Sequence, residues 1–588
     1  MALEPDYTGG FDQAELNDQA SNEPTDEFVA GTFVGRQAEQ ARFREMLREM
    51  AGPRKGFFSS LLGGAPRKTK TSKTSPVKSR VVLISGQAGS GKTRLSLRLR
   101  EIVQKEKEFT HRFRTVRFDL ADIFQRDTRL SARLDGENLS PEVVLDLLHN
   151  HILRENGEGY FEDYRAALVE TAELARTVQG AELQAVWDYR ARAFGQSLKV
   201  WSNDRPIILI IDDISLIKTN LISLLETILE KSGSQNLVIL AGEFVPPGLA
   251  EVIMPERFAA FETGPLSEEE LKSLVEIELL RYRTGHRPGA GQPGQTLLFP
   301  GLLEDILQIT GGQPLACRVA SFLLQTGLSA RDLTANPGEG QSEILTRLAE
   351  KFIAGPLGPG HPDRLKLYAL AVLRRPEPGL LAALFDLRKD MLEIDETLGR
   401  FNQRYAFLFE PGRPMNLHRA LLPAFRHWLV QPDRRSDQGG LVKVNQHGLE
   451  YLDTRLQEWG ANFGSLRDRL NDLKWREWAL DKTWHSFWIS EGLGWPVALS
   501  MLVAGLGLRP LFARQVTALL EQVDKAGLLD ERGQQRLALF RKSVVLPPEE
   551  TQPILDEYRM LGREGNFFIN GLPQFAPELS KIIEGLLS

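Results

Sequence analysis

A glycine-rich segment is the first place in this sequence where residue types and spacing predict chemistry. Residues 86–93 fit the pattern G-x-x-x-x-G-K-[ST] at every fixed position. Glycines let backbone N–H groups converge on phosphate oxygens, and a lysine adds a point charge. We therefore expect a nucleotide phosphate site that consists of Gly86, Gln87, Ala88, Gly89, Ser90, Gly91, Lys92, Thr93 and the adjacent Arg94.

Two neighbouring carboxylates supply the expected partner of that segment. Asp212 and Asp213 directly follow the apolar run at 207–211. Ligands of open α/β folds bind at the carboxyl ends of the strands. We expect Asp212, together with the Thr93 hydroxyl, to hold the Mg²⁺ that accompanies ATP or ADP. Asp213 is expected to orient or deprotonate the attacking water, with Lys92 as its catalytic partner; a helix N-cap is the alternative role for Asp213.

These side chains need a sheet to bring them together. Apolar runs predict strands at 81–84, 115–119, 207–211 and 237–240, and helical spacing fills residues 141–200. Strands that are apolar on both faces and alternate with helices indicate a parallel sheet covered on both sides, which is an α/β P-loop fold. After Pro265 the pattern is helical, with a hairpin near 407–415.

The order of these motifs resembles the STAND class of AAA+-related NTPases, which includes apoptosome-type and NOD-like switches and bacterial signalling ATPases. Residues 33–37 look like the family's N-terminal motif, so the resemblance places Val34, Gly35 and Arg36 at the adenine pocket. Residues 311–316 look like the G-x-P motif, whose proline, here Pro314, packs on adenine. Residues 416–419 lie where the "MHD" motif is expected, and His418 would contact the β-phosphate of ADP.

Several positions depart from the family pattern. Gln37 stands where Glu is usual, and Arg419 stands where the MHD motif has Asp. After the strand at 237–240, Glu243 lies where many members have an arginine that senses the γ-phosphate. A carboxylate cannot donate to a phosphate, so slow hydrolysis is expected. Arg318 is a candidate replacement sensor, although a structural role is the simpler interpretation.

The resemblance implies a regulatory ATPase in signalling or defence. It would close around ADP, open or form homo-oligomers with ATP, and bind a protein partner through its C-terminal helices. The expected domains are a disordered acidic tail (1–30), a nucleotide-binding domain (31–262) with a basic flexible loop (54–80), a helical lid (263–350), a winged helix (351–432) and an α-helical domain (433–588).

Two other classes of function stay open. A DNA-binding AAA+ ATPase, of the origin-recognition or transposition-helper type, also joins a P-loop domain to a winged helix. It would need basic residues such as Arg413, His418, Arg419, Arg426, His427, Arg434 and Arg435, and nucleic acid is the corresponding partner. A scaffold that binds nucleotide only for stability is the third class.

Composition sets broad limits. The chain has 588 residues, enough for several domains, and its formal net charge of −6 argues against a general polycation. Its single cysteine, Cys317, allows no intramolecular disulfide and favours a cytoplasmic protein. The apolar segment 492–508 is interrupted by glycines and Pro496, so we expect a buried helix-loop-helix and no membrane span. Five tryptophans are expected in the core: Trp475, Trp478, Trp484, Trp488 and Trp495.

Overall fold

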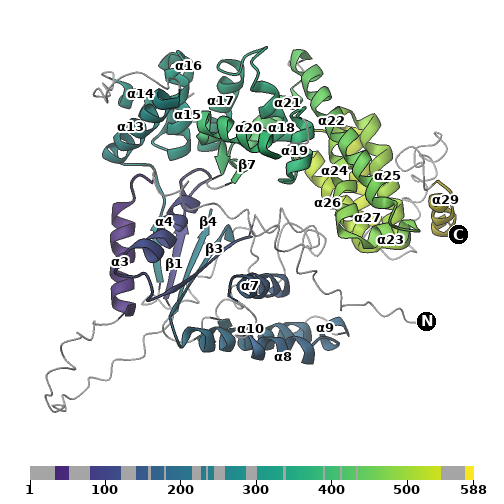
Figure 1. Cartoon of the computed structure of the whole chain (residues 1–588), viewed down its shortest axis with the longest axis horizontal. Helices are drawn as coiled ribbons and strands as arrows, with labels where there is room; N and C mark the ends of the chain where they lie inside the picture. Colours follow the sequence, from purple (N-terminus) through teal and green to yellow (C-terminus); the bar gives the residue numbers. More distant parts are fainter. Residues whose placement is uncertain are drawn as a thin grey trace.

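The chain is seen in a computed structural model (Figure 1). It describes residues 33–51, 80–120, 141–156, 161–177, 181–214, 227–228, 230–232, 236–243, 258–285, 301–334, 339–387, 391–410, 413–431, 435–543 and 576–587. The expected acidic tail and nearly all of the expected basic loop lie outside these residues.

A five-stranded parallel sheet forms the N-terminal part. Its strands are β1 (Arg80–Ser85), β2 (Arg114–Asp119), β3 (Ile207–Asp212), β4 (Leu237–Gly242) and β5 (Phe258–Glu262), in the order β2-β3-β4-β1-β5. Four of them confirm the predicted strands. β5 was not predicted, because this short edge strand alternates buried and exposed residues and has no long apolar run.

Helices cover both faces of the sheet, as predicted (Figure 1). Successive residues of a strand point to opposite faces, and in β3 both sets are apolar and buried. Ile208 and Ile210 pack with α3 (Gln37–Ala51) and α4 (Lys92–Lys105). Leu209 and Ile211 pack in a second core with α7 (Pro141–Asn156), α8 (Glu162–Glu170) and α10 (Ala181–Ser202). The short helix α9 (Leu174–Thr177) lies between α8 and α10 in the chain.

A helical region follows the sheet. The first helices are α13 (Glu268–Gly285), α14 (Leu302–Thr310), α15 (Pro314–Gln325) and α16 (Ala330–Leu333). Next come α17 (Gln341–Ala354), α18 (Arg364–Val372), α19 (Pro378–Leu384), α20 (Met391–Arg404), the 3₁₀ helix η6 (Ala406–Leu408) and α21 (Leu422–Val430). An antiparallel hairpin, β6 (Phe409–Glu410) and β7 (Arg413–Leu417), precedes α21 and confirms the predicted hairpin.

The C-terminal helices are α22 (Arg435–Gly460), α23 (Leu466–Asn471), α24 (Leu473–Ile489), α25 (Glu491–Leu508), α26 (Pro510–Lys525), α27 (Glu531–Ser543) and α29 (Ala576–Leu587). The helix-loop-helix expected at 492–508 was wrong, because α25 continues through Pro496. Among the described residues α25 is the one helix apolar and long enough to cross a membrane, but 61% of it is buried inside the protein. That burial stabilises the helix despite the proline.

One hydrophobic core joins most of the helical region. It begins at Ile309 in α14, includes the β6–β7 hairpin and reaches Leu579 in α29. The five tryptophans expected in the core are all buried, as predicted. The core crosses positions 350 and 432, where domain boundaries were expected, so packing is continuous across both.

Candidate active site

The glycine-rich segment forms a tight loop between β1 and α4. Gly86, Gly89 and Gly91 have positive φ angles, which favour glycine. A Cβ on Gly86 would lie 2.2 Å from the Thr263 hydroxyl oxygen, so no larger residue fits there. The Ser90 hydroxyl lies 2.7 Å from the same Thr263 oxygen, which ties the loop to the end of β5. The loop is therefore fixed against the sheet.

Lys92 is the first residue of α4, and its ammonium group turns back over the loop. Its Nζ donates to the carbonyl oxygens of Gly86 at 2.7 Å and Gln87 at 2.9 Å. Burial lowers the pKa of Lys92, while the carboxylates of Glu243, Asp212 and Asp213 oppose that shift. The ammonium is thus within a concave loop of backbone groups, with acidic side chains nearby.

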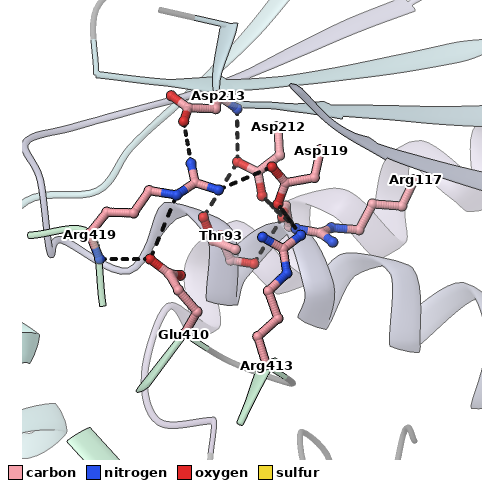
Figure 2. Close-up of polar contacts among 9 residues, drawn as sticks. Thr93, Arg117, Asp119, Asp212, Asp213, Glu410, Arg413 and Arg419 are labelled. Atoms are coloured by element: carbon pink, nitrogen blue, oxygen red, sulfur yellow. Dashed lines mark hydrogen bonds and ion pairs between the residues drawn. The ribbon is translucent and has the colours of Figure 1, made fainter. Parts of the chain in front are cut away.

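Asp212 ends β3 with its carboxylate buried among four donors (Figure 2). The Thr93 hydroxyl at 3.4 Å and the Asp213 backbone N–H at 3.1 Å donate to Oδ1. The Ser96 hydroxyl at 3.1 Å and the Arg117 guanidinium at 2.9 Å donate to Oδ2. Burial raises the pKa of Asp212, against the opposing effect of Arg117. A carboxylate has about four lone-pair positions, so all of them are occupied here.

Arg117 and Asp119, on strand β2, are two site residues that the sequence reasoning missed. Asp119 is the register partner of Asp212 on the neighbouring strand. Arg117 Nη2 lies 3.1 Å from Asp119 Oδ2 and 2.9 Å from Asp212 Oδ2, so one nitrogen serves both carboxylates. Their i, i+2 spacing at the carboxyl end of a predicted strand was the available signal.

The β6–β7 hairpin reaches this edge of the sheet from the helical region (Figure 2). Arg419, which follows β7, forms an ion pair with Asp213 and lies 3.3 Å from Asp119 Oδ1. Arg413 at the start of β7 lies 3.0 Å from Asp119 Oδ2. Within the hairpin, Glu410 accepts the Arg419 backbone N–H at 2.9 Å. Two arginines far along the chain therefore hold the acidic residues of the sheet.

His418 lies half-buried beside these arginines, and its ring Nδ1 accepts the Ala420 backbone N–H at 3.2 Å. Burial lowers its pKa; Glu410 opposes the shift, and Arg318, Arg94 and Arg419 add to it. The charge of Arg94, the other expected phosphate ligand, thus acts on His418.

The residues expected at adenine lie between the sheet and α13. Val34 packs in a small core with α13 and α15. Gly35 and Arg36 have positive φ angles, and the Arg36 backbone N–H donates to Glu270 at 2.5 Å. Pro314 is the first residue of α15. The preceding Gln313 donates to the Ala88 carbonyl oxygen at 2.6 Å and so attaches α15 to the glycine-rich loop.

Arg318, the candidate sensor, is engaged elsewhere. Its Nε donates to Glu278 of α13 at 2.7 Å, and both side chains are buried. This pair links α13 to α15, which favours the structural role for Arg318. Glu243, after β4, lies close enough to act on the charge of Lys92. The carboxylate of Glu243 cannot donate to a phosphate, and Arg318 is held by Glu278 through Nε, although its buried Nη2 has no hydrogen-bond partner.

The family described as "AAA ATPase domain" matches this chain over residues 69–240, a stretch that holds both the glycine-rich loop and Asp212. The chain carries an AAA-type ATPase domain. The expectation of an AAA+-related P-loop NTPase is thereby confirmed, and the reaction that belongs to the domain is hydrolysis of ATP to ADP and phosphate. A search among curated protein sequences found no significant match.

Solved structures overlap with the chain only loosely. A STAND protein with a tetratricopeptide repeat sensor from Pyrococcus horikoshii has a TM-score of 0.41 and 13% identity, and covers 95% of this chain. This chain spans 66% of that protein's length. The Drosophila origin recognition complex bound to DNA gives 0.27 and 12% over 69% of this chain and 82% of that one. PCH-2 of C. elegans gives 0.22 and 11%, over 56% and 72%.

The ATPase domain has a donor set that fits a divalent cation bound with nucleotide. The Thr93 hydroxyl and the Asp212 carboxylate are hard oxygen ligands on adjacent elements, 3.4 Å apart. Among the described residues no group of three or more His, Cys, Asp or Glu side chains could hold a metal by itself. Nucleotide phosphates and water would therefore have to complete the shell.

The basic residues considered for nucleic-acid binding are partly used inside the protein. Arg413 and Arg419 pair with aspartates of the ATPase domain. Arg426 donates to the Ala371 carbonyl oxygen at 2.9 Å and lies over Trp484, and burial lowers its pKa to about 10. His418 is half-buried, whereas His427 is exposed. The three arginines are therefore partly committed to contacts inside the protein in this arrangement.

Proposed function

We propose that the chain is a regulatory switch ATPase of the STAND class, closed with ADP and open or self-associated with ATP. The observation that carries this proposal is the contact of the β6–β7 hairpin with the ATPase domain. Arg413 and Arg419 bind Asp119 and Asp213, the residues beside the nucleotide site. A contact between the helical region and the catalytic carboxylates makes the arrangement of domains depend on the occupancy of the site.

Each site residue has a role in this proposal. Backbone N–H groups at 86–93 bind the phosphates, and Lys92 turns from the loop carbonyls to the β- and γ-phosphates. Thr93 and Asp212 hold Mg²⁺, which adds charge neutralisation at the phosphates. Asp213 orients the attacking water. Because Arg419 occupies Asp213 in the closed arrangement, hydrolysis there is slow.

The remaining phosphate and adenine contacts come from both sides of the site. Arg94 and His418 meet the phosphates from α4 and from the hairpin side. Val34, Gly35, Arg36 and Pro314 enclose the adenine. This role is supported by the contact between Gln313 and Ala88, which brings the start of α15 onto the phosphate loop.

The C-terminal helices are proposed to transmit the signal. The buried carboxylate of Asp481 in α24 pairs with Arg374 at 2.6 Å and with Arg375, both in the turn after α18. The Trp484 indole N–H donates to the Val372 carbonyl oxygen at 2.6 Å. We infer a division into residues 31–262, 263–350, 351–432 and 433–588, in which the last two move together. A protein bound to the C-terminal helices in the cytoplasm would then act on the hairpin.

Thermal unfolding with nucleotide tests the site directly. Ligand at 100 times its dissociation constant stabilises the native state by about 2.7 kcal/mol. ADP or ATP with Mg²⁺ should raise the melting temperature, and Lys92→Ala should abolish the rise. Lys105→Ala is the matched control, because Lys105 lies at the other end of α4 in an exposed pair with Glu101. A full rise in the melting temperature of the Lys92→Ala protein would show that Lys92 does not bind the nucleotide.

A further inference from the structure

Arg117 is shared between two carboxylates that lie side by side. Asp119 and Asp212 are register partners on adjacent parallel strands, where the backbones are about 4.8 Å apart. Two carboxylates at this spacing repel each other. The Arg117 Nη2 atom bridges them at 3.1 Å and 2.9 Å, so neither carboxylate holds it alone.

Docking of the hairpin changes how strongly the Asp119 carboxylate attracts the Arg117 guanidinium. With the hairpin docked, Asp119 also contacts Arg413 at 3.0 Å and Arg419 at 3.3 Å. Asp119 is then well neutralised, and Arg117 is available to Asp212. If the hairpin leaves, Asp119 keeps Arg117 as its only cation among these three, and the guanidinium shifts away from Asp212.

Charge at the sheet edge changes in the direction that a divalent cation requires. With the hairpin docked, three aspartates (Asp119, Asp212 and Asp213) face three arginines, and Glu410 arrives with the hairpin. Without the hairpin, Asp119 and Asp213 lose the guanidinium groups of Arg413 and Arg419, while Arg117 stays at the sheet edge. The edge therefore becomes more negative when the hairpin leaves, which favours a divalent cation.

We propose that Arg117 and Asp119 are positioning residues that form a relay, by which docking of the β6–β7 hairpin sets the affinity of Asp212 for a divalent cation. This relay rests on the proposed nucleotide site at Thr93 and Asp212. Docking lets Arg117 bind Asp212 as well as Asp119 and so disfavours the cation, and release draws Arg117 toward Asp119. Thermodynamic linkage makes the effect reciprocal, so cation binding at Asp212 loosens the hairpin.

The relay predicts opposite effects from removing the two members of one ion pair. Arg117→Gln should tighten divalent-cation binding, because Asp212 loses its competing donor. Asp119→Asn should weaken it, because Arg117 then stays on Asp212. A merely structural ion pair would give the same direction for both variants. We expect changes of about tenfold each, within the usual range of coupling between sites.

The experiment measures the dissociation constant of Mn²⁺, the probe for the cation, by electron paramagnetic resonance on full-length protein with ADP. Each variant is combined with Arg413→Ala/Arg419→Ala. These hairpin substitutions should tighten Mn²⁺ binding about tenfold in the wild-type background and less than about twofold with Arg117→Gln or Asp119→Asn. Arg114→Gln is the control, because Arg114 lies on the same strand but pairs with Asp204 at the strand's other end.

Additive effects of the hairpin and relay substitutions, or equal directions for Arg117→Gln and Asp119→Asn, would overturn the relay. Arg117→Met, an apolar side chain of similar length, replaces Arg117→Gln if that protein does not fold. Binding of a fluorescent ADP in EDTA, which removes divalent cations, distinguishes failure of the nucleotide site from failure of the relay. If ADP does not bind even to the wild-type protein, the nucleotide site is refuted; if ADP and Mn²⁺ bind without coupling, only the relay is.

Discussion

Truncation of Arg419 should release the hairpin from the ATPase domain and accelerate the loss of ADP. The Arg419 guanidinium forms two contacts across this boundary, with Asp213 and Asp119. A hydrogen bond to a charged group is worth about 1.5–3 kcal/mol. The Arg419 side chain is 32% exposed, and solvent screening places the energy of its pair with Asp213 toward the low end of that range. Asp119 keeps Arg117 and Arg413, so no bare buried carboxylate remains.

We therefore expect Arg419→Ala to cost about 2 kcal/mol of docking free energy, which is roughly a 30-fold change in the docking equilibrium. If ADP leaves only from the undocked state, the release rate of a fluorescent ADP rises by the same factor. His418→Ala should raise it less, by about fivefold, because it removes one proposed hydrogen bond to the ADP phosphate, worth about 1 kcal/mol, and none of the ion pairs of the hairpin.

Stopped-flow displacement of the fluorescent ADP by excess unlabelled ADP gives both rates, and size-exclusion chromatography with ATP reports self-association. Arg400→Ala is the control, since Arg400 bonds only within α20. Moderate salt should accelerate release from the wild type more than from Arg419→Ala, because the ion pairs are screened. The reasoning fails if His418→Ala speeds release as much as Arg419→Ala, or if Arg419→Ala leaves the rate unchanged.

Two further predictions concern the carboxylates and a buried histidine. Asp213→Asn should keep nucleotide affinity and lower turnover, whereas Asp212→Asn should weaken Mg²⁺-dependent binding; equal binding defects, measured by titration with fluorescent ADP, would contradict this division. His485 is buried with Nδ1 2.7 Å from Asn445 Oδ1, and burial lowers its pKa to about 4. Its contribution to stability is therefore complete above about pH 6.5 and is lost as the pH falls toward 4, by about 2 kcal/mol at pH 5. Urea unfolding at pH 7 and pH 5 should show that His485→Gln removes this loss, while the half-buried His447→Gln does not.

Local sequence was enough to predict the parts of the site whose residues lie in one short segment of the chain. The glycine-rich loop has all its determinants within residues 86–93, and Asp212 follows a short apolar run that predicts a buried strand. Backbone geometry alone brings these two segments together, because both lie at carboxyl ends of strands in one parallel sheet. That logic predicts from the sequence that Thr93 and Asp212 lie together, and their oxygen atoms are 3.4 Å apart.

The same reasoning from local sequence could not predict that Asp119 joins the site or that Arg419 pairs with Asp213. Asp119 joins the site only because β2 lies next to β3, and strand order is not encoded in a local pattern. Arg419 and Asp213 are 206 positions apart, so only the packing of the helical region onto the sheet pairs them. The edge strand β5 was missed because one face of it is exposed.

Glu410 explains why the hairpin can bind and release the ATPase domain reversibly. It accepts the Arg419 backbone N–H at 2.9 Å and lies 3.8 Å from the guanidinium Nε, and Arg419 follows the hairpin by two residues. Burial opposes ionisation of Glu410, yet His418 and Arg419 hold its pKa below the ordinary value. Arg419 is thus oriented before docking, which reduces the entropy lost when it reaches Asp213. After release the Arg419 guanidinium keeps Glu410 as a partner, so undocking does not leave this arginine unpaired, and modest changes at the nucleotide site are enough to move the equilibrium.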